Sequence, residues 1–306
     1  MDVDARASFT AETMALQRAF ESHRPSKSRL FSDPYADAFL RPWMRWMAAA
    51  SATPVLRGAA TRLFDAKTGP GPRPSAIIRT RVIDDALVDI VNRHHQIAFV
   101  DADKSSQVVV LGAGFDTRAY RLSALATARV FELDHPATQR AKRQVIDRLG
   151  LSSDHVTHAP INFEHDDLHE VLTNAGIDPN SPIVFLWEGV TNYLSAHAVD
   201  DTLATIRRLS RSPYAALIVT YIDIRALDDP SPFPEARRWV KAVRDAGEPW
   251  TFGLHPRSAS QYFHDRGYQV RTDISTKDAG QQLFRDAHRT EQGSALYRVL
   301  VADIPR

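Results

Sequence analysis

One stretch decides the fold of this chain: Val108-Val109-Val110-Leu111-Gly112-Ala113-Gly114-Phe115-Asp116-Thr117-Arg118. It opens with four apolar residues, three of them β-branched, which indicate a buried strand, and two glycines follow in a tight turn. Glycine has no Cβ, so the backbone of this turn can approach a ligand closely. Asp116 can then cap a following helix by accepting its free N–H groups. The stretch predicts a strand, a ligand-binding turn and a helix start.

The composition of the 306 residues narrows the class of protein around this turn. The chain is 43% hydrophobic and 25% charged, which is ordinary for a globular protein. Its net charge of +1 argues against a nucleic-acid partner. Cysteine is absent, so disulfides, thiolate zinc sites and cysteine nucleophiles are excluded, and a cytoplasmic location is expected.

The most apolar early segment, residues 43–60, does not predict a membrane span. Arg45 and Arg57 interrupt it, and it is too short and too charged to cross a bilayer. The sequence therefore predicts a protein without a membrane partner.

Two helices are expected near the N-terminus, over residues 9–21 and 34–50. The second carries Phe39, Trp43, Trp46 and Met47 at helical spacing. Such a stripe usually belongs to the core, although a helical cap over a pocket mouth would also use it. Residues 68–74 hold three prolines and two glycines and read as a linker.

A strong helix is expected from residue 75 to about residue 94, and its phase separates two arginines. Arg79 falls among the apolar residues of one face, whereas Arg81 points towards Asp85 and Asp89. An inward guanidinium requires an anion, since an unpaired buried charge is costly. We expect Arg79 to bind a ligand carboxylate in preference to forming a structural salt bridge.

Polar residues follow the ends of the next predicted strands. Asp134 ends the strand over residues 128–134, twenty residues after Gly114, where nucleotide-binding α/β folds place a carboxylate on ribose hydroxyls. Its alternative role is to cap the helix that starts at Pro136. Asn162 and Phe163 follow a strand near residues 156–161 and could meet the edge and face of an adenine. Glu188 ends a buried run that starts at residue 182. Because ligands bind at the carboxyl ends of such strands, one shared site is expected.

The rest of the chain completes a doubly wound α/β pattern. It predicts a helix over residues 196–210, a strand over 215–222, a Pro-rich crossover, two helices and a terminal antiparallel pair over 268–274 and 295–303. His165 and His169 are four residues apart, but the interleaved acidic residues favour a solvated helix start, and no metal site is expected.

The spacing of the turn favours one ligand over others. A dinucleotide fingerprint requires a third glycine where this chain has Thr117, and no Gly-Lys-Ser/Thr phosphate loop is present. The turn, the acid at the end of the second strand and the inward arginine together suit S-adenosylmethionine, which carries adenine, ribose and a zwitterionic methionine.

Several runs resemble the leucine carboxyl methyltransferase superfamily, which includes many bacterial S-adenosylmethionine-dependent methyltransferases. They are Asp33-Pro34, Arg79-Thr80-Arg81, Ile83-Asp84-Asp85, Leu111–Arg118, Phe131-Glu132-Leu133-Asp134-His135-Pro136 and Glu188-Gly189-Val190-Thr191-Asn192-Tyr193-Leu194. The resemblance implies a class I methyltransferase fold, with a doubly wound, mostly parallel seven-stranded sheet under an N-terminal helical lid. It implies one domain over residues 1–306, with the lid over 1–74, the core over 75–306 and a substrate-pocket insertion near 225–255.

The resemblance also implies roles for the residues at the strand ends. An arginine, here Arg79 by its phase, holds the cofactor carboxylate, and an N-terminal basic residue assists it, either Arg18, Arg24 or Lys27. The resemblance further implies that Gly112, Ala113 and Gly114 contact the methionine moiety and that Asp134 binds the ribose. It implies that Asn162 and Phe163 contact the adenine. Glu188 is implied to bind the cofactor amino group or to line the substrate pocket. Asn162 stands where the family usually has Asp.

The acceptor is open at this point, and so is the oligomeric state. An ionised carboxylate needs no base, whereas a phenol, an amine or an indole requires removal of a proton. The candidates for that role are Tyr193, Glu188, Tyr221 and Asp223. Tyr193 is favoured among them, and a packing role for Tyr193 under the lid is an equal alternative. A small aromatic or carboxyl acceptor and a peptide C-terminus are both expected possibilities; a nicotinamide-dependent oxidoreductase and a non-catalytic cofactor-binding module are the alternatives.

Overall fold

The computed structural model describes residues 9–98, 105–163, 165–245 and 249–306. Seven strands form one sheet in the order β3-β2-β1-β4-β5-β7-β6, and β7 runs antiparallel to both of its neighbours. Their bounds are β1 Gln107–Leu111, β2 Arg129–Asp134, β3 Val156–Pro160, β4 Ile183–Trp187, β5 Ala215–Ile222, β6 Gln269–Ser275 and β7 Tyr297–Asp303. This arrangement confirms the predicted doubly wound, mostly parallel sheet.

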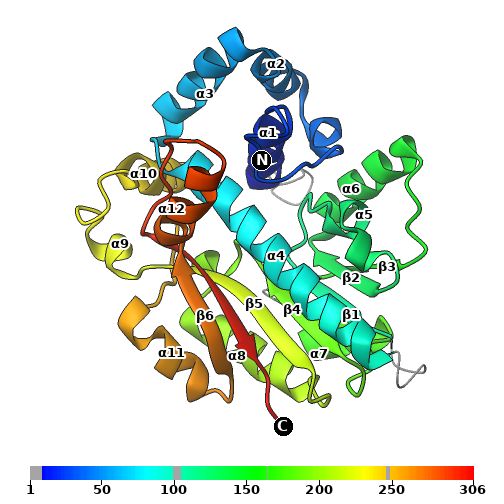
Figure 1. Cartoon of the computed structure of the whole chain (residues 1–306). Helices are drawn as coiled ribbons and strands as arrows, with labels where there is room; N and C mark the ends of the chain where they lie inside the picture. The colour runs from blue at the N-terminus through cyan, green and yellow to red at the C-terminus, as the bar shows by residue number, and fades with distance from the viewer. Residues whose placement is uncertain (1–8, 99–104, 164, 246–248) are drawn as a thin grey trace.

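Helices cover both faces of the sheet, which explains why β1, β4 and β5 are buried along their whole length (Figure 1). On one face, α4 (Pro72–Ala98) buries Ile83, Leu87 and Ile90 against β1 and β4. On the other face, the core is completed by α7 (Leu168–Asn174), α8 (Ala196–Arg208) and α11 (Pro256–His264). The remaining helices of the sheet domain are α5 (Arg118–Arg121), α6 (Pro136–Leu149), α9 (Arg225–Asp228), α10 (Arg237–Asp245) and α12 (Thr276–Asp286).

The N-terminal helices α1 (Phe9–Ser22), α2 (Pro42–Ser51) and α3 (Pro54–Thr68) lie beyond the carboxyl ends of the strands (Figure 1). The single helix expected over residues 34–50 is wrong, because a 3₁₀ turn, η2 (Ala36–Phe39), ends before α2 restarts at Pro42. The restart changes the helical phase: Phe39 is buried, whereas Trp43 and Trp46 are 49% and 81% exposed. The expectation of a continuous aromatic core stripe is therefore also wrong.

The linker expected over residues 68–74 is shorter in the structure, because its last residues belong to α4. Gly69 ends α3 with φ +93°, but α4 already begins at Pro72. Proline is tolerated in the first turn of a helix, since the N–H groups there have no intrahelical partner. α12, which lies between the two terminal strands, is not among the expected helices, although Ser275 caps its start. Among the described residues, no helix combines the length and the apolar character needed to cross a membrane.

A buried ion pair joins the second strand, β2, to helix α6. Glu132 of β2 and Lys142 of α6 are each 1% exposed, and Lys142 Nζ lies 2.7 Å from Glu132 Oε2. Burial of a charge without a partner would cost several kcal/mol. The pair thus fixes α6 against the strand that ends in Asp134.

We expect Gly112→Ala to lower the free energy of unfolding by about 2 kcal/mol, because a left-handed backbone costs about 1 kcal/mol and overpacking at least about as much. Gly112 has φ +70°, and a Cβ built there would lie 2.4 Å from Val190 Cγ2. Gly150 is a matched control: it has φ +64°, with nothing within 4 Å of the added Cβ. Chemical denaturation should show Gly150→Ala losing about 1 kcal/mol from strain alone. Equal losses in the two variants would contradict a close approach at Gly112.

Candidate functional site

The glycine turn after β1 is tied to the end of β2. The Gly114 N–H donates to Asp134 Oδ2 at 2.5 Å, and the Ala113 N–H donates to the Leu133 carbonyl at 2.8 Å. Burial raises the pKa of Asp134, although the N–H groups of Gly114 and His135 act against it. The cap of α6 is the side chain of His135, which accepts from the Ala137 N–H, so the capping role considered for Asp134 is wrong.

Arg79 and Glu188 meet at the same edge of the sheet. Arg79 is 6% exposed, and its Nε donates to Glu188 Oε1 at 2.7 Å. The guanidinium also lies 4.8 Å from the Tyr297 ring centroid and 3.5 Å, through Nη2, from Met14 Sδ. Arg81 lies on the exposed side of α4, where its Nε donates to Asp85 Oδ2 at 2.7 Å. The inward phase of Arg79 and the surface pair of Arg81 are both confirmed.

Arg118 is the central residue that the sequence did not reveal. Its Nη1 donates to Glu188 Oε2 and its Nε to Asp84 Oδ1, both at 2.7 Å, and its backbone N–H donates to Asp116 Oδ1 at 2.7 Å. Arg121 adds two hydrogen bonds to Asp84, at 2.7 and 2.8 Å. Arg118 belongs to the glycine-turn stretch. A charged residue so close to the end of a buried strand was the signal in the sequence that could have indicated its role.

These side chains form a balanced charge network of three arginines and three carboxylates: Arg79, Arg118, Arg121, Asp84, Asp116 and Glu188. Burial alone would raise the pKa of Glu188, but Arg118 and Arg79 outweigh it and lower the pKa. Burial opposes ionisation of Asp116 in the same way, and Arg118 holds its pKa below the usual range of a carboxyl. Glu188 is therefore an ionised carboxylate and a weak base.

The first helix packs directly on the glycine turn. A Cβ built at Gly114 would lie 3.4 Å from Ala11 Cβ. Arg18 of α1 donates through Nη2 to the Phe115 carbonyl at 2.5 Å and through Nε to Asp33 at 2.8 Å. Of the three basic residues considered near the N-terminus, Arg18 reaches the turn, whereas Arg24 pairs with Glu291 and Lys27 is exposed.

The proton-transfer candidates lie in different surroundings. The buried Tyr221 hydroxyl donates to Asp273 Oδ2 at 2.6 Å, and burial raises its pKa above its usual value. Asp223 pairs with Arg225 at 2.5 Å. Tyr193 is half-buried in η4 (Thr191–Tyr193), the 3₁₀ turn that follows Glu188.

Two further predicted contacts lie at the end of β3. Asn162 and Phe163 are half-buried just beyond this strand, and Phe163 packs against the core of the sheet. The Ile161 N–H donates to the Asp134 carbonyl at 3.0 Å, which holds the two strand ends together. The structure thus brings the predicted residues of β1, β2, β3 and β4 to one edge.

Aromatic side chains connect this edge to the segment 225–255. The Trp239 ring of α10 stacks on Tyr297 at a centroid distance of 5.5 Å, and Trp250 meets Trp239 edge-on at 5.2 Å. Residues 246–248 of the predicted insertion lie outside the described residues. The Thr251 N–H donates to the Asn192 carbonyl at 2.8 Å, so the end of the insertion packs on η4.

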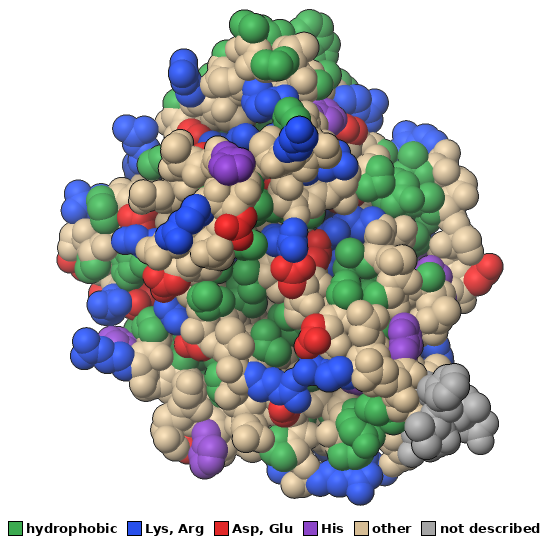
Figure 2. Space-filling view, in the orientation of Figure 1, with side chains coloured by type: hydrophobic (Ala, Val, Ile, Leu, Met, Phe, Trp, Pro, Cys, Tyr) green, Lys and Arg blue, Asp and Glu red, His purple; other side chains and the backbone are tan. Residues whose placement is uncertain are grey.

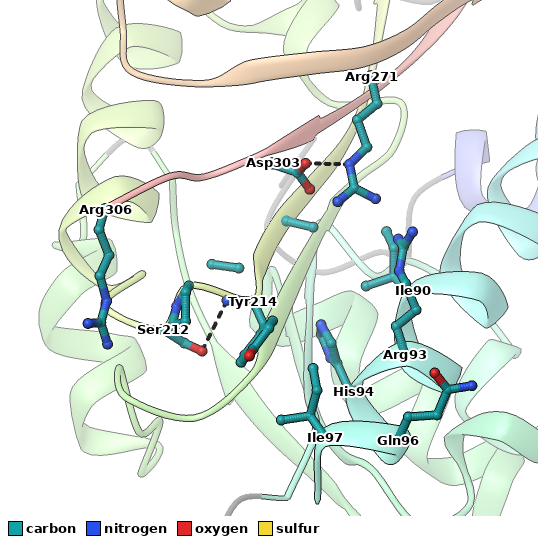
Figure 3. Close-up of a pocket in the computed structure, with 13 residues that line it drawn as sticks. Ile90, Arg93, His94, Gln96, Ile97, Ser212, Tyr214, Arg271, Asp303 and Arg306 are labelled. Atoms are coloured by element: carbon teal, nitrogen blue, oxygen red, sulfur yellow. Dashed lines mark hydrogen bonds and ion pairs between the residues drawn. The ribbon is translucent and has the colours of Figure 1, made fainter.

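A hollow of about 730 Å³ lies at the opposite edge of the sheet (Figure 3). It is lined by residues such as Ile90, His94, Tyr214, Arg271 and Asp303, where β5 begins and β7 ends. No predicted site residue lines it. Because ligands of doubly wound sheets bind at the carboxyl ends of the strands, the candidate site is the edge that carries Gly112, Asp134 and Glu188.

Comparison with known proteins identifies the family of this site. A family model described as leucine carboxyl methyltransferase matches residues 11–207. This range includes most of α1, the glycine turn, Arg79 and Glu188.

This chain belongs to the leucine carboxyl methyltransferase family.

Two relatives of the family carry provisional names as S-adenosyl-L-methionine-dependent methyltransferases. The chain is 35% identical over 212 residues to one from Frankia alni, covering 69% of this chain and 67% of the relative. It is 32% identical over 252 residues to one from Mycolicibacterium gilvum, covering 80% and 74%. The resemblance drawn from the sequence is confirmed. At the level of the family, so is the expectation of a methyltransferase enzyme that uses S-adenosylmethionine.

Two solved structures share the fold over nearly the whole chain. One, titled as a provisional methyltransferase from Thermobifida fusca, has a TM-score of 0.57 and 16% identity, covering 94% of this chain and 97% of the other. Another, a protein from Streptomyces avermitilis, has a TM-score of 0.53 and 12% identity, covering 99% and 100%. These likenesses support the class I fold assigned to this leucine carboxyl methyltransferase family member.

Proposed function

We propose that this chain transfers the methyl group of S-adenosylmethionine to a hydroxyl group of a small aromatic molecule. Family membership supports the methyl donor. The observation that carries the acceptor is the stack of Arg79, Tyr297, Trp239 and Trp250, which runs from the charge network into the segment 225–255.

The charge network fits the amino-acid part of the cofactor. The Arg79–Glu188 pair offers one guanidinium and one carboxylate side by side, which complements a carboxylate and an ammonium on one carbon. The carboxylate and the ammonium of the amino-acid part cancel, so the network remains balanced around them, and the sulfonium adds one positive charge at the methyl group. We assign the cofactor carboxylate to Arg79 and the cofactor amino group to Glu188.

The remaining cofactor contacts follow from the strand ends. Gly112, Ala113 and Gly114 present backbone without large side chains, and the close approach of Val190 to Gly112 shows how tightly this turn is packed. We assign the methionine chain to this turn and the ribose hydroxyls to Asp134. Asn162 and Phe163 would then meet the adenine.

Aromatic side chains next to the network favour an aromatic acceptor. Flat rings stack with one another, and each such contact contributes about 1 kcal/mol beyond the burial of apolar area. Two buried polar atoms in this region, Asn192 Oδ1 and Trp250 Nε1, have no hydrogen-bond partner among the described residues. A polar substituent on an aromatic acceptor would satisfy such groups, whose desolvation is otherwise costly.

The same network offers an acceptor carboxylate no arginine of its own. Each of its three arginines already has a carboxylate partner. The cofactor brings a carboxylate, an ammonium and a sulfonium, so its sulfonium alone would face the charge of an acceptor carboxylate. Guanidinium pairing therefore gives a peptide carboxylate no support, and the choice of a hydroxyl acceptor rests on the aromatic stack.

The chain's contribution to the reaction is positioning, exclusion of water and management of one proton. S-adenosylmethionine, when bound, supplies a methyl group activated by its sulfonium. The acceptor oxygen forms a bond to the methyl carbon as the carbon–sulfur bond breaks, and the hydroxyl proton must leave. Glu188 is a weak base, and Tyr221 and Asp223 are held by Asp273 and Arg225. We assign Tyr193 to hydrogen-bond the acceptor hydroxyl and to pass its proton to solvent, because Tyr193 lies half-buried on the turn that follows Glu188, where the end of the 225–255 segment packs.

Incubation with methyl-labelled S-adenosylmethionine and a panel of acceptors tests this function by mass spectrometry. The panel contains phenolic and polycyclic aromatic compounds, aromatic acids and peptides with free C-termini. We expect labelled aryl methyl ethers, which resist mild base. Labelled methyl esters of the peptides, which mild base hydrolyses, would assign the acceptor to the peptide class instead. Cofactor binding without any labelled product would support a non-catalytic module.

A further inference from the structure

The outer surface of α2 and α3 is apolar and uncovered in the described chain. Nine large apolar side chains of the described residues are exposed, and five of them lie on these two helices: Trp43, Trp46, Val55, Leu56 and Leu63. Val55 and Trp46 are 87% and 81% exposed. We call these five residues the α2–α3 ridge. Exposed apolar surface gathered in one place marks an interaction site more often than single exposed residues do.

Both helices of the ridge are amphipathic. Met44 and Ala48 of α2, and Ala60 and Phe64 of α3, are buried against the rest of the chain. The ridge residues therefore occupy faces that the fold itself leaves free. Figure 1 shows α2 and α3 meeting at an outward corner, and Figure 2 shows hydrophobic side chains gathered at the top of the same view.

The charges around the ridge are almost all positive. Residues 41–68 contain Arg41, Arg45, Arg57, Arg62 and Lys67 against one acid, Asp65, which Arg73 pairs at 2.8 Å. Arg45, Arg62 and Lys67 are exposed. Two copies of this surface facing each other would place like charges together, so charge complementarity favours an anionic partner over a second copy.

We propose that the α2–α3 ridge docks on the surface of an anionic lipid bilayer. Helices that lie in a bilayer interface combine tryptophan and aliphatic residues on one face with lysine and arginine beside it, which is the composition of the ridge. A protruding corner suits a compliant interface, and tryptophan rings favour the level of the headgroups. This inference concerns a surface contact and departs from the expectation, drawn from the sequence, of no membrane partner.

The inference is independent of the proposed acceptor. In the sequence, Arg45 and Arg57 interrupt the apolar run, so the sequence alone does not predict this apolar surface. In the structure, the five apolar side chains are exposed, and Arg45 and Arg62 are exposed on the same two helices. Within the N-terminal helices, α2 packs on α1, and α1 contacts the glycine turn. Docking would therefore place the bilayer on the side of the molecule that carries the candidate site.

Co-sedimentation of the full chain with vesicles tests the proposal. We expect binding to vesicles of phosphatidylcholine with phosphatidylglycerol, much weaker binding to phosphatidylcholine alone, and a loss of binding as salt screens the charges. The double variant Trp46→Ser/Val55→Ser should bind at least about tenfold more weakly, since both side chains would otherwise leave water on docking. Tyr214→Ser, which removes a side chain that is 47% exposed far from the ridge, should bind like the parent chain.

A second pair of variants separates charge from apolar contact. Arg62→Glu/Lys67→Glu should lose the preference for phosphatidylglycerol while keeping the fold, because both side chains are exposed. No binding to the anionic vesicles at low salt would overturn the proposal. So would a dimer, seen by light scattering, that Trp46→Ser/Val55→Ser dissolves in the absence of vesicle binding, since the partner would then be a second copy.

Discussion

With a phenolic acceptor, Tyr193→Phe is expected to lower kcat about 100-fold while the Kd for S-adenosylmethionine stays within about twofold. General acid–base assistance contributes roughly 10²–10⁴-fold to a rate, and the lower end suits a group that relays a proton from an acidic hydroxyl. Tyr193 lies on the turn after Glu188, and the end of the 225–255 segment packs against that turn. Steady-state kinetics and a cofactor titration measure the two quantities separately.

Two comparisons make this result specific. Tyr221→Phe removes a hydroxyl that is already donated to Asp273, so it should reduce stability without a comparable fall in kcat. An acceptor carboxylate is ionised at neutral pH and needs no proton relay. If Tyr193→Phe left the rate with phenolic acceptors unchanged, the assigned role of Tyr193 would be wrong, although the family and the methyl donor would stand.

Arg79→Ala is expected to weaken S-adenosylmethionine binding about 100-fold, as measured by calorimetry. Hydrogen bonds to charged groups contribute about 1.5–3 kcal/mol, and loss of a bidentate contact reaches this range. The substitution also leaves Glu188 with Arg118 as its remaining arginine partner in the network. Arg79→Lys should recover part of the affinity, because it restores the charge without the planar fork.

Arg81→Ala is the matched control on the same helix. Arg81 is half-buried on the other side of α4, where it pairs with Asp85 and donates to the Leu30 carbonyl at 2.6 Å. Its removal should change the cofactor affinity by no more than about twofold, since surface ion pairs contribute little. Equal losses for the two arginines would refute the assignment of Arg79 to the cofactor carboxylate.

Local sequence pattern was sufficient to predict most of the fold and part of the candidate site. Strand ends, glycines and helical phase placed Gly112, Asp134, Glu188 and Arg79 at one edge, because each depends on neighbours within a few residues. Partners distant in sequence were not accessible in this way. Arg79 and Glu188 are 109 residues apart, and the phase of α4 could show that an anion was needed but not which one. Family membership then removed support for the nicotinamide alternative.

Two of the wrong predictions have the same physical cause, which is the dual effect of proline on helix ends and helix starts. At Pro42 a proline that starts a helix also ends the preceding turn, and the change of phase exposed Trp43 and Trp46. At Pro72 the same property of proline allowed a helix where a linker was expected. Arg118 was overlooked because its partners Asp84 and Glu188 come together only through the sheet.

The contact of α1 with the glycine turn has a consequence for the order of events in each catalytic cycle. Arg18 donates to the Phe115 carbonyl, and Ala11 lies over Gly114. With the cofactor bound at this turn as we propose, we infer that spent S-adenosylhomocysteine is exchanged for a fresh donor only when this packed helix opens, a motion that sets the turnover number of many enzymes. We expect the methylated product to leave first and the spent cofactor last, with release, rather than methyl transfer, governing the steady-state rate.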